Sequence, residues 1–144
     1  MNIHNSYFAI KNPLQLIDSC LHPHRHEIRL DYKGKKLLVR WTERAERQLA
    51  KRQAPLIVEM QIYFSCVVQK RVLFHESTEF STQKVSDRLQ LLLRPVEADS
   101  CDPVEFARNH PVSHEYTTTA AKSFRPSKLE LDYKNGEWRG EFGI

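Results

Sequence analysis

Three histidines, His22, His24 and His26, occupy alternate positions in a segment that also contains Cys20. Alternate side chains of an extended chain project to the same side, so two of these imidazoles could bind one divalent transition metal such as zinc. The spacing matches none of the paired Cys and His patterns typical of zinc sites. Because Pro23 is typical of a connecting segment, a polar loop is the favoured interpretation. The sequence therefore predicts no cofactor, with a transition metal as the alternative.

Lysine and arginine are concentrated in the first half of this chain of 144 residues and net charge +4. Residues 1–75 hold 13 basic and 6 acidic side chains, whereas residues 76–144 hold 9 and 12. A solvated face would explain this imbalance. However, the predicted hairpin of residues 26–41 places like charges opposite one another, and an anionic partner would reduce their repulsion. The candidate residues for binding an acidic protein or another anionic ligand are Arg29, Lys33, Lys36, Arg40, Arg44, Arg47 and Lys51.

Two other classes of partner have less support. Nucleic acid is disfavoured because Tyr32 and Trp41 fall on the predicted buried face, which leaves the basic surface without an aromatic platform for bases. A membrane partner is not expected, because no apolar run approaches the roughly 20 residues that a membrane-spanning helix needs.

The cysteines and glycines of the sequence do not predict catalysis. Cys20, Cys66 and Cys101 are odd in number, which argues against a disulfide framework. Together with the lack of a signal-peptide pattern after Met1, this predicts a cytoplasmic location. The 4 glycines form no dinucleotide, phosphate-loop or hydrolase motif. Cys66 lies in an apolar stripe, which favours a buried thiol over a nucleophile, so we predict no catalytic residue.

Three short helices are predicted to position these residues. The first covers residues 13–21, begins at Asn12-Pro13 and packs one apolar face. The second covers residues 43–53, with Thr42 as its N-cap and Ala45 and Leu49 buried. The third begins with a capping box at residues 102–105 and ends near residue 110.

Alternating apolar and polar residues predict several strands. In the first hairpin, a two-residue loop of Gly34 and Lys35 sets Tyr32 opposite Leu37 and also Arg29 opposite Arg40 and Lys33 opposite Lys36. We prefer it to a Lys33-Gly34 loop because it pairs apolar with apolar residues. Strands are also predicted over residues 56–68, with a break near residue 70, and over residues 88–94.

The C-terminal segment has the clearest local pattern. Asn135-Gly136 is the strongest two-residue hairpin signal and is flanked by alternating residues. It predicts that Tyr133 lies opposite Trp138 and Asp132 opposite Arg139.

These elements predict a single α+β domain over residues 1–144, in which about three helices pack on a curved, mainly antiparallel sheet of five to seven strands. A partly open β-barrel is the alternative. For function, we expect a non-enzymatic binding or adaptor domain that presents the basic surface to an acidic partner and self-associates, with a homodimer as the simplest form. The alternative is a metal-binding protein or metal-dependent enzyme that uses His22, His24 and His26.

Overall fold

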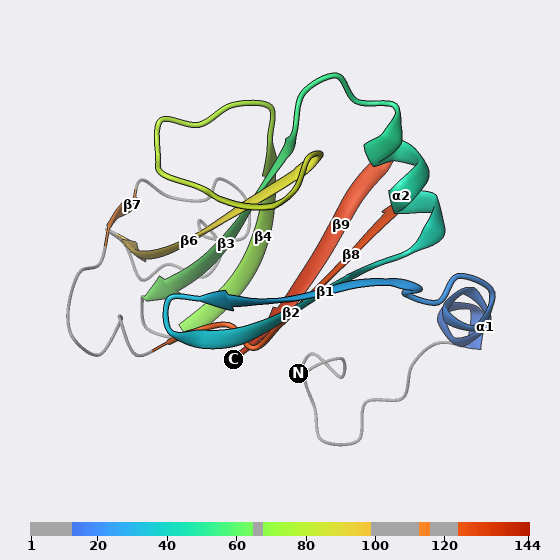
Figure 1. The fold of residues 1–144 in the computed structure, drawn as a ribbon. Coiled ribbons are helices and arrows are strands. Elements are labelled where there is room, and N and C mark those ends of the chain that lie inside the picture. The colour runs from blue at the N-terminus through green and yellow to red at the C-terminus, as the bar shows by residue number, and fades with distance from the viewer. Residues whose placement is uncertain (1–12, 65–67, 99–112, 116–123) are drawn as a thin grey trace.

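The computed structural model describes residues 13–64, 68–98, 113–115 and 124–144, and most of these residues lie in two β-sheets that face each other (Figure 1). Sheet A has the strand order β1 (His26–Tyr32), β2 (Lys35–Trp41), β8 (Lys128–Lys134) and β9 (Glu137–Gly143). Sheet B has the order β4 (Val68–His75), β3 (Leu56–Phe64), β6 (Leu89–Ala98) and β5 (Gln83–Ser86), with β7 (Ser113–Glu115) also paired to β6. The helices of the described part are α1 (Pro13–Leu21) and α2 (Glu43–Ala50).

The predicted α+β class, with about three helices on one mainly antiparallel sheet, is wrong. The strands form two separate sheets, and each is mixed because β2 pairs with β8 in parallel and β3 pairs with β6 in parallel. This arrangement is also not the single partly open barrel of the alternative. Local hairpin patterns reveal antiparallel neighbours, whereas these parallel pairs join segments that are distant in sequence. The third predicted helix lies outside the described residues.

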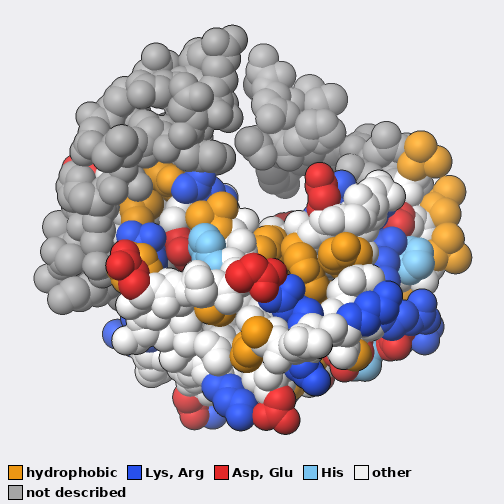
Figure 2. All heavy atoms as spheres, turned by 90° about the horizontal axis from the view of Figure 1, so that it is seen from above, with side chains coloured by type: hydrophobic (Ala, Val, Ile, Leu, Met, Phe, Trp, Pro, Cys, Tyr) orange, Lys and Arg blue, Asp and Glu red, His pale blue; other side chains and the backbone are white. Residues whose placement is uncertain are grey.

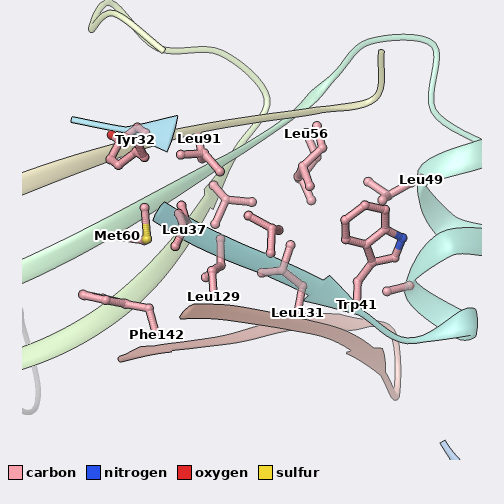
Figure 3. Close-up of a cluster of buried hydrophobic side chains, with 14 of the residues drawn as sticks. Tyr32, Leu37, Trp41, Leu49, Leu56, Met60, Leu91, Leu129, Leu131 and Phe142 are labelled. Carbon is pink, nitrogen blue, oxygen red and sulfur yellow. The ribbon is translucent and has the colours of Figure 1, made fainter. Parts of the chain in front are cut away.

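The hydrophobic core lies between the two sheets (Figure 3). Alternate residues of β3, Val58, Met60 and Ile62, are fully buried, as the predicted apolar stripe requires. From sheet A they meet Leu129 of β8, while Trp41 points toward α2. The long strand predicted over residues 56–68 is shorter than expected, since β3 ends at Phe64 and β4 begins at Val68.

The first hairpin has a different register from the predicted one. Its loop is Lys33-Gly34, with φ of 51° and 84°, as in the hairpin turn whose twist matches the strands. Tyr32 therefore lies opposite Lys35, and the predicted pairing of like charges is wrong. The register instead sets Asp31 opposite Lys36 and Glu27 opposite Arg40. Complementary charges across the strands thus remove the repulsion that pointed to an anionic partner.

The second hairpin and the start of α2 are as predicted. Tyr133 lies opposite Trp138, and Asn135 and Gly136 have positive φ values of 54° and 78°. Thr42 caps α2 by accepting a hydrogen bond from the N–H of Ala45 at 3.3 Å. The helix ends at residue 50, three residues before its predicted end.

Candidate binding site beside the two helices

Arg44 joins three elements of the fold. From α2, its Nε and Nη2 donate to the two carboxylate oxygens of Asp132 on β8, at 2.7 and 2.5 Å. Its Nη1 and Nη2 also donate to Asp18 of α1, at 3.3 and 3.0 Å. Thr42 adds a hydrogen bond from Oγ1 to Asp132 at 2.6 Å. We call Asp18, Arg44 and Asp132 the Arg44 cluster, and it attaches α1 to α2 and to sheet A.

The charges of the Arg44 cluster change the acidity of its carboxylates. Burial raises the pKa of Asp132, but hydrogen bonds from Arg44, Thr42 and the Tyr133 N–H outweigh it and lower this pKa to about 2. The hydrogen bond from Arg44 also lowers the pKa of Asp18. Both carboxylates are therefore ionised at neutral pH, and the cluster is intact there.

Three apolar side chains of α1 are exposed to solvent. Leu14, Ile17 and Leu21 follow the predicted helical spacing, yet they are 74%, 56% and 69% exposed. The prediction that this apolar face packs against the domain is therefore wrong. The sequence showed the periodicity of the helix but not the bonds of Asp18, which turn the polar side of α1 toward the domain. Large apolar side chains that gather on a surface are typical of interaction sites.

A groove of about 210 Å³ lies between the end of α1 and α2. Leu21 and Pro23 form part of its lining, together with Arg25 and Arg47. Arg25 is exposed, and the side chain of Arg47 is 71% exposed. Figure 2 shows hydrophobic side chains at the end of the molecule that α1 occupies in Figure 1, beside a group of Lys and Arg side chains. The groove therefore combines an apolar wall with exposed positive charge.

Glu43 is the acidic residue in the lining of this groove, and its charge is shared. His26 Nε2 lies 2.6 Å from Glu43 Oε2, and Arg47 Nε lies 3.9 Å from Glu43 Oε1. The hydrogen bond with His26 and the positive charges of Arg47 and Arg25 lower the pKa of Glu43 below its usual value. Glu43 offsets one positive charge, so Arg25 and Arg47 together still leave this part of the groove positively charged.

The seven basic residues predicted to bind an anion do not form one surface. The β1–β2 turn and α2 lie at opposite ends of sheet A (Figure 1), which separates Lys33 and Lys36 from Arg44, Arg47 and Lys51. Lys33 lies over the ring of Tyr32, and Lys51 is exposed. The other five lie within 4.0 Å of a carboxylate of the protein: Arg29, Lys36, Arg40, Arg44 and Arg47.

The three predicted metal ligands have separate surroundings. His24 Nδ1 lies 3.4 Å from Glu130 Oε2, whereas His26 pairs with Glu43 and stacks on Trp41 at a ring distance of 6.0 Å. His22 lines the groove beside α2. Among the described residues, no group of three or more His, Cys, Asp or Glu side chains is placed to hold a metal ion.

A second cavity, of about 390 Å³, lies between α1 and the outer face of sheet A. His22 and His24 line it, together with carboxylates of α1, β8 and β9. Its wall residue Glu130 already pairs with His24, with Lys128 at 2.9 Å and with Arg40 at 3.9 Å. The polar wall of this cavity is thus stabilised by ion pairs within the protein.

Sequence reasoning identified part of this site and missed the rest. It placed Arg44 and Arg47 on one helix, but it did not single out Arg25 as a groove residue. It also missed Asp18 as the partner of Arg44, because an ion pair between residues 26 apart leaves no periodic signal. The usable signal was Asp18 itself, a lone carboxylate among the apolar residues of α1.

The comparisons with known proteins give no relative from which a function could be carried over. Neither the protein-family models, nor the curated proteins, nor the solved structures contain a match to this chain. Within the described ranges, no helix has both the length and the apolar character needed to cross a membrane.

Proposed function

We propose that this chain is a non-enzymatic binding domain that docks an acidic partner segment in the groove between α1 and α2. The observation that carries the proposal is the exposed apolar face of α1 next to exposed arginines. Leu21 is 69% exposed and lines the same groove as Arg25 and Arg47. An apolar contact surrounded by charge is the usual composition of a protein-binding surface.

The chemistry of the groove defines the partner. An apolar side chain of the partner would pack against Leu21 and Pro23, where burial of apolar surface supplies most of the binding free energy. Carboxylates beside that side chain would face the guanidinium groups, which favour carboxylate partners because their N–H groups can donate in pairs. The expected partner is therefore an acidic segment with an apolar side chain near its centre.

Site-specific photocrosslinking in cells tests this proposal. A photoreactive amino acid at Leu21 should form a covalent adduct whose partner peptide, sequenced by mass spectrometry, is rich in Asp and Glu. The same amino acid at Val68, which is apolar and 52% exposed on β4, is the matched control and should not give that adduct. Reversing two charges with Arg25→Glu and Arg47→Glu should reduce the adduct about tenfold, equivalent to about 1.4 kcal/mol.

Three results would contradict the proposal. The first is an identical set of adducts from the two crosslinking positions, and the second is an adduct that survives both charge reversals unchanged. The third is an adduct with a second copy of this chain alone, which would make the exposed face of α1 a surface for self-association instead.

A further inference from the structure

The outer face of sheet B carries a row of two arginines and a glutamine. Gln61 of β3 lies directly opposite Arg71 of β4 and directly opposite Arg94 of β6. Paired residues of adjacent strands project to the same face, and strands lie about 4.8 Å apart, so the two arginines are about 10 Å apart at their Cα atoms. We call Arg71, Gln61 and Arg94 the arginine row.

A buried polar network surrounds the arginine row. Arg71 Nε donates to Gln61 Oε1 at 2.7 Å, and Arg71 Nη2 donates to the hydroxyl of Tyr63. Glu59 is the neighbour of Gln61 on the same face of β3, and it is 2% exposed. It accepts hydrogen bonds from Gln61 and from His75, the latter at 3.1 Å. Arg94 Nη1 lies 3.5 Å from Glu59.

Each arginine of the row also has a buried nitrogen that the network does not use. Arg71 Nη1 and Arg94 Nε are inaccessible to solvent and have no hydrogen-bond partner among the residues that the structure describes. Nη1 carries two hydrogens and Nε carries one, so three N–H donors are available. Buried donors without partners are rare in folded proteins, and such donors are often satisfied by a bound ion.

Positive charge is in excess on this face. Glu59 is the buried carboxylate in contact with the network, whereas Arg71 and Arg94 contribute two positive charges. Burial lowers the pKa of Arg71, although Tyr63 and Glu59 act in the opposite direction. Buried charge without a counter-charge is strongly unfavourable, so the row would be stabilised by an additional anion.

We infer that the arginine row is a binding site for a small oxyanion, a carboxylate or phosphate group whose oxygens accept hydrogen bonds from Arg71 Nη1 and Arg94 Nε. Guanidinium groups suit both anions because their planar N–H groups match oxygen pairs. The site lies in sheet B and is independent of the groove beside α1.

The exposed part of the network indicates how an anion would reach the row. The side chains of His75 and Arg94 are 33% and 21% exposed, whereas Glu59 and Gln61 are buried. Phe80, from the segment between β4 and β5, lies with its ring 4.0 Å from the guanidinium of Arg94 and is 38% exposed. An anion would therefore enter beside Arg94, whose guanidinium is covered on one side by the ring of Phe80.

Titration of the full chain with two probe anions tests this inference. Isothermal calorimetry with sodium phosphate and with sodium malonate, each against sodium chloride at equal ionic strength, should show saturable one-to-one binding of at least one probe. Three charge-assisted hydrogen bonds predict a Kd of about 1 mM or lower. Tighter binding of phosphate would indicate a phosphorylated ligand, and tighter binding of malonate a carboxylic acid.

Variants separate this site from general attraction to positive charge. Arg71→Gln and Arg94→Gln should each weaken binding at least tenfold, while Arg29→Gln, at a residue whose side chain is 75% exposed on sheet A, should leave it unchanged. If a glutamine variant does not fold, Arg94→Lys provides the second test, since it keeps the charge but removes the planar donors. No binding of either probe at 10 mM, or equal binding by wild type and the Arg94 variants, would overturn the inference.

Discussion

Replacing Asp132 by Asn tests whether the charge of the Arg44 cluster attaches α1 and α2 to sheet A. The substitution keeps the size of the side chain and one oxygen acceptor, but it removes the negative charge that faces Arg44 at 2.5 to 2.7 Å. The Asp132 side chain is 22% exposed, so solvent screens this interaction only in part. We therefore expect a measurable loss of stability at neutral pH.

The pKa of Asp132 gives the size of that loss. Folding lowers this pKa from 3.8 to about 2, and each pKa unit corresponds to about 1.4 kcal/mol. The ionised carboxylate thus contributes about 2 kcal/mol to the free energy of unfolding. Because the pKa is lower in the folded state, the contribution is complete above pH 3.8 and decreases as the pH falls toward 2.

Urea unfolding at several pH values measures this contribution. At pH 7, Asp132→Asn should lower the free energy of unfolding by about 2 kcal/mol, and the difference from wild type should shrink between pH 4 and pH 2. Asp87→Asn is the control, because Asp87 also pairs with a basic side chain, that of Lys84, but is itself 91% exposed. That exposed pair should contribute much less to stability than the Arg44 cluster, because solvent screens both of its charges.

Two outcomes would refute this reasoning. A loss at pH 7 no larger than that of Asp87→Asn would mean that the Arg44 cluster contributes little net stability. A loss that stays constant down to pH 2 would mean that the substitution acts through packing or hydrogen bonding, and not through the charge of Asp132.

Three further predictions concern the sheets and the histidines. Gly140→Ala should lower the free energy of unfolding in urea by about 1 to 3 kcal/mol, because the added Cβ would lie 2.8 Å from Val72 Cγ1. Adding Val72→Ala should restore part of this loss, and no rescue would refute the contact. Gly136→Ala should cost about 1 to 2 kcal/mol through its φ of 78° alone, because no atom lies within 4 Å of the added carbon, and an unchanged unfolding midpoint would contradict this. Native mass spectrometry of untagged protein, purified without chelators, should show no stoichiometric zinc, since His24 and His26 pair with different carboxylates; a zinc adduct that disappears in a His24→Ala/His26→Ala variant would overturn this.

Local patterns in the sequence predicted the C-terminal hairpin and the start of α2, but not the turn of the first hairpin. The C-terminal hairpin was correct in register because Asn135-Gly136 suits a turn with two positive φ values and the flanking residues agree with it on both faces. The turn of the first hairpin was predicted one residue too late, which shifts the strand pairing by two residues, because apolar pairing was weighed above turn geometry. The positive φ of Lys33 was not expected. The opposite charges of Asp31 and Lys36, which face each other in the observed register, favoured that register.

The arrangement of these elements could not be read from the sequence. The parallel pairs of β2 with β8 and of β3 with β6 decide the architecture, and each joins segments separated by other elements. The arginine row depends on the same pairing, since only the alignment of β4, β3 and β6 brings Arg71 and Arg94 to either side of Gln61. Single residues within alternating strands give no signal of which strands become neighbours.

The orientation of α1 links the stability of the Arg44 cluster to the proposed binding function. A helix of nine residues is too short to be stable alone, so its contacts with the domain must hold it. Those contacts use Asp18, while Ile17 and Leu21 remain exposed, although burying such side chains would contribute about 1.5 to 3 kcal/mol each. Polar bonds therefore hold α1 in an orientation that hydrophobic burial alone would not select. A partner that covers Leu21 would recover this burial free energy. Substitutions that weaken the Arg44 cluster should therefore also weaken the binding of the partner.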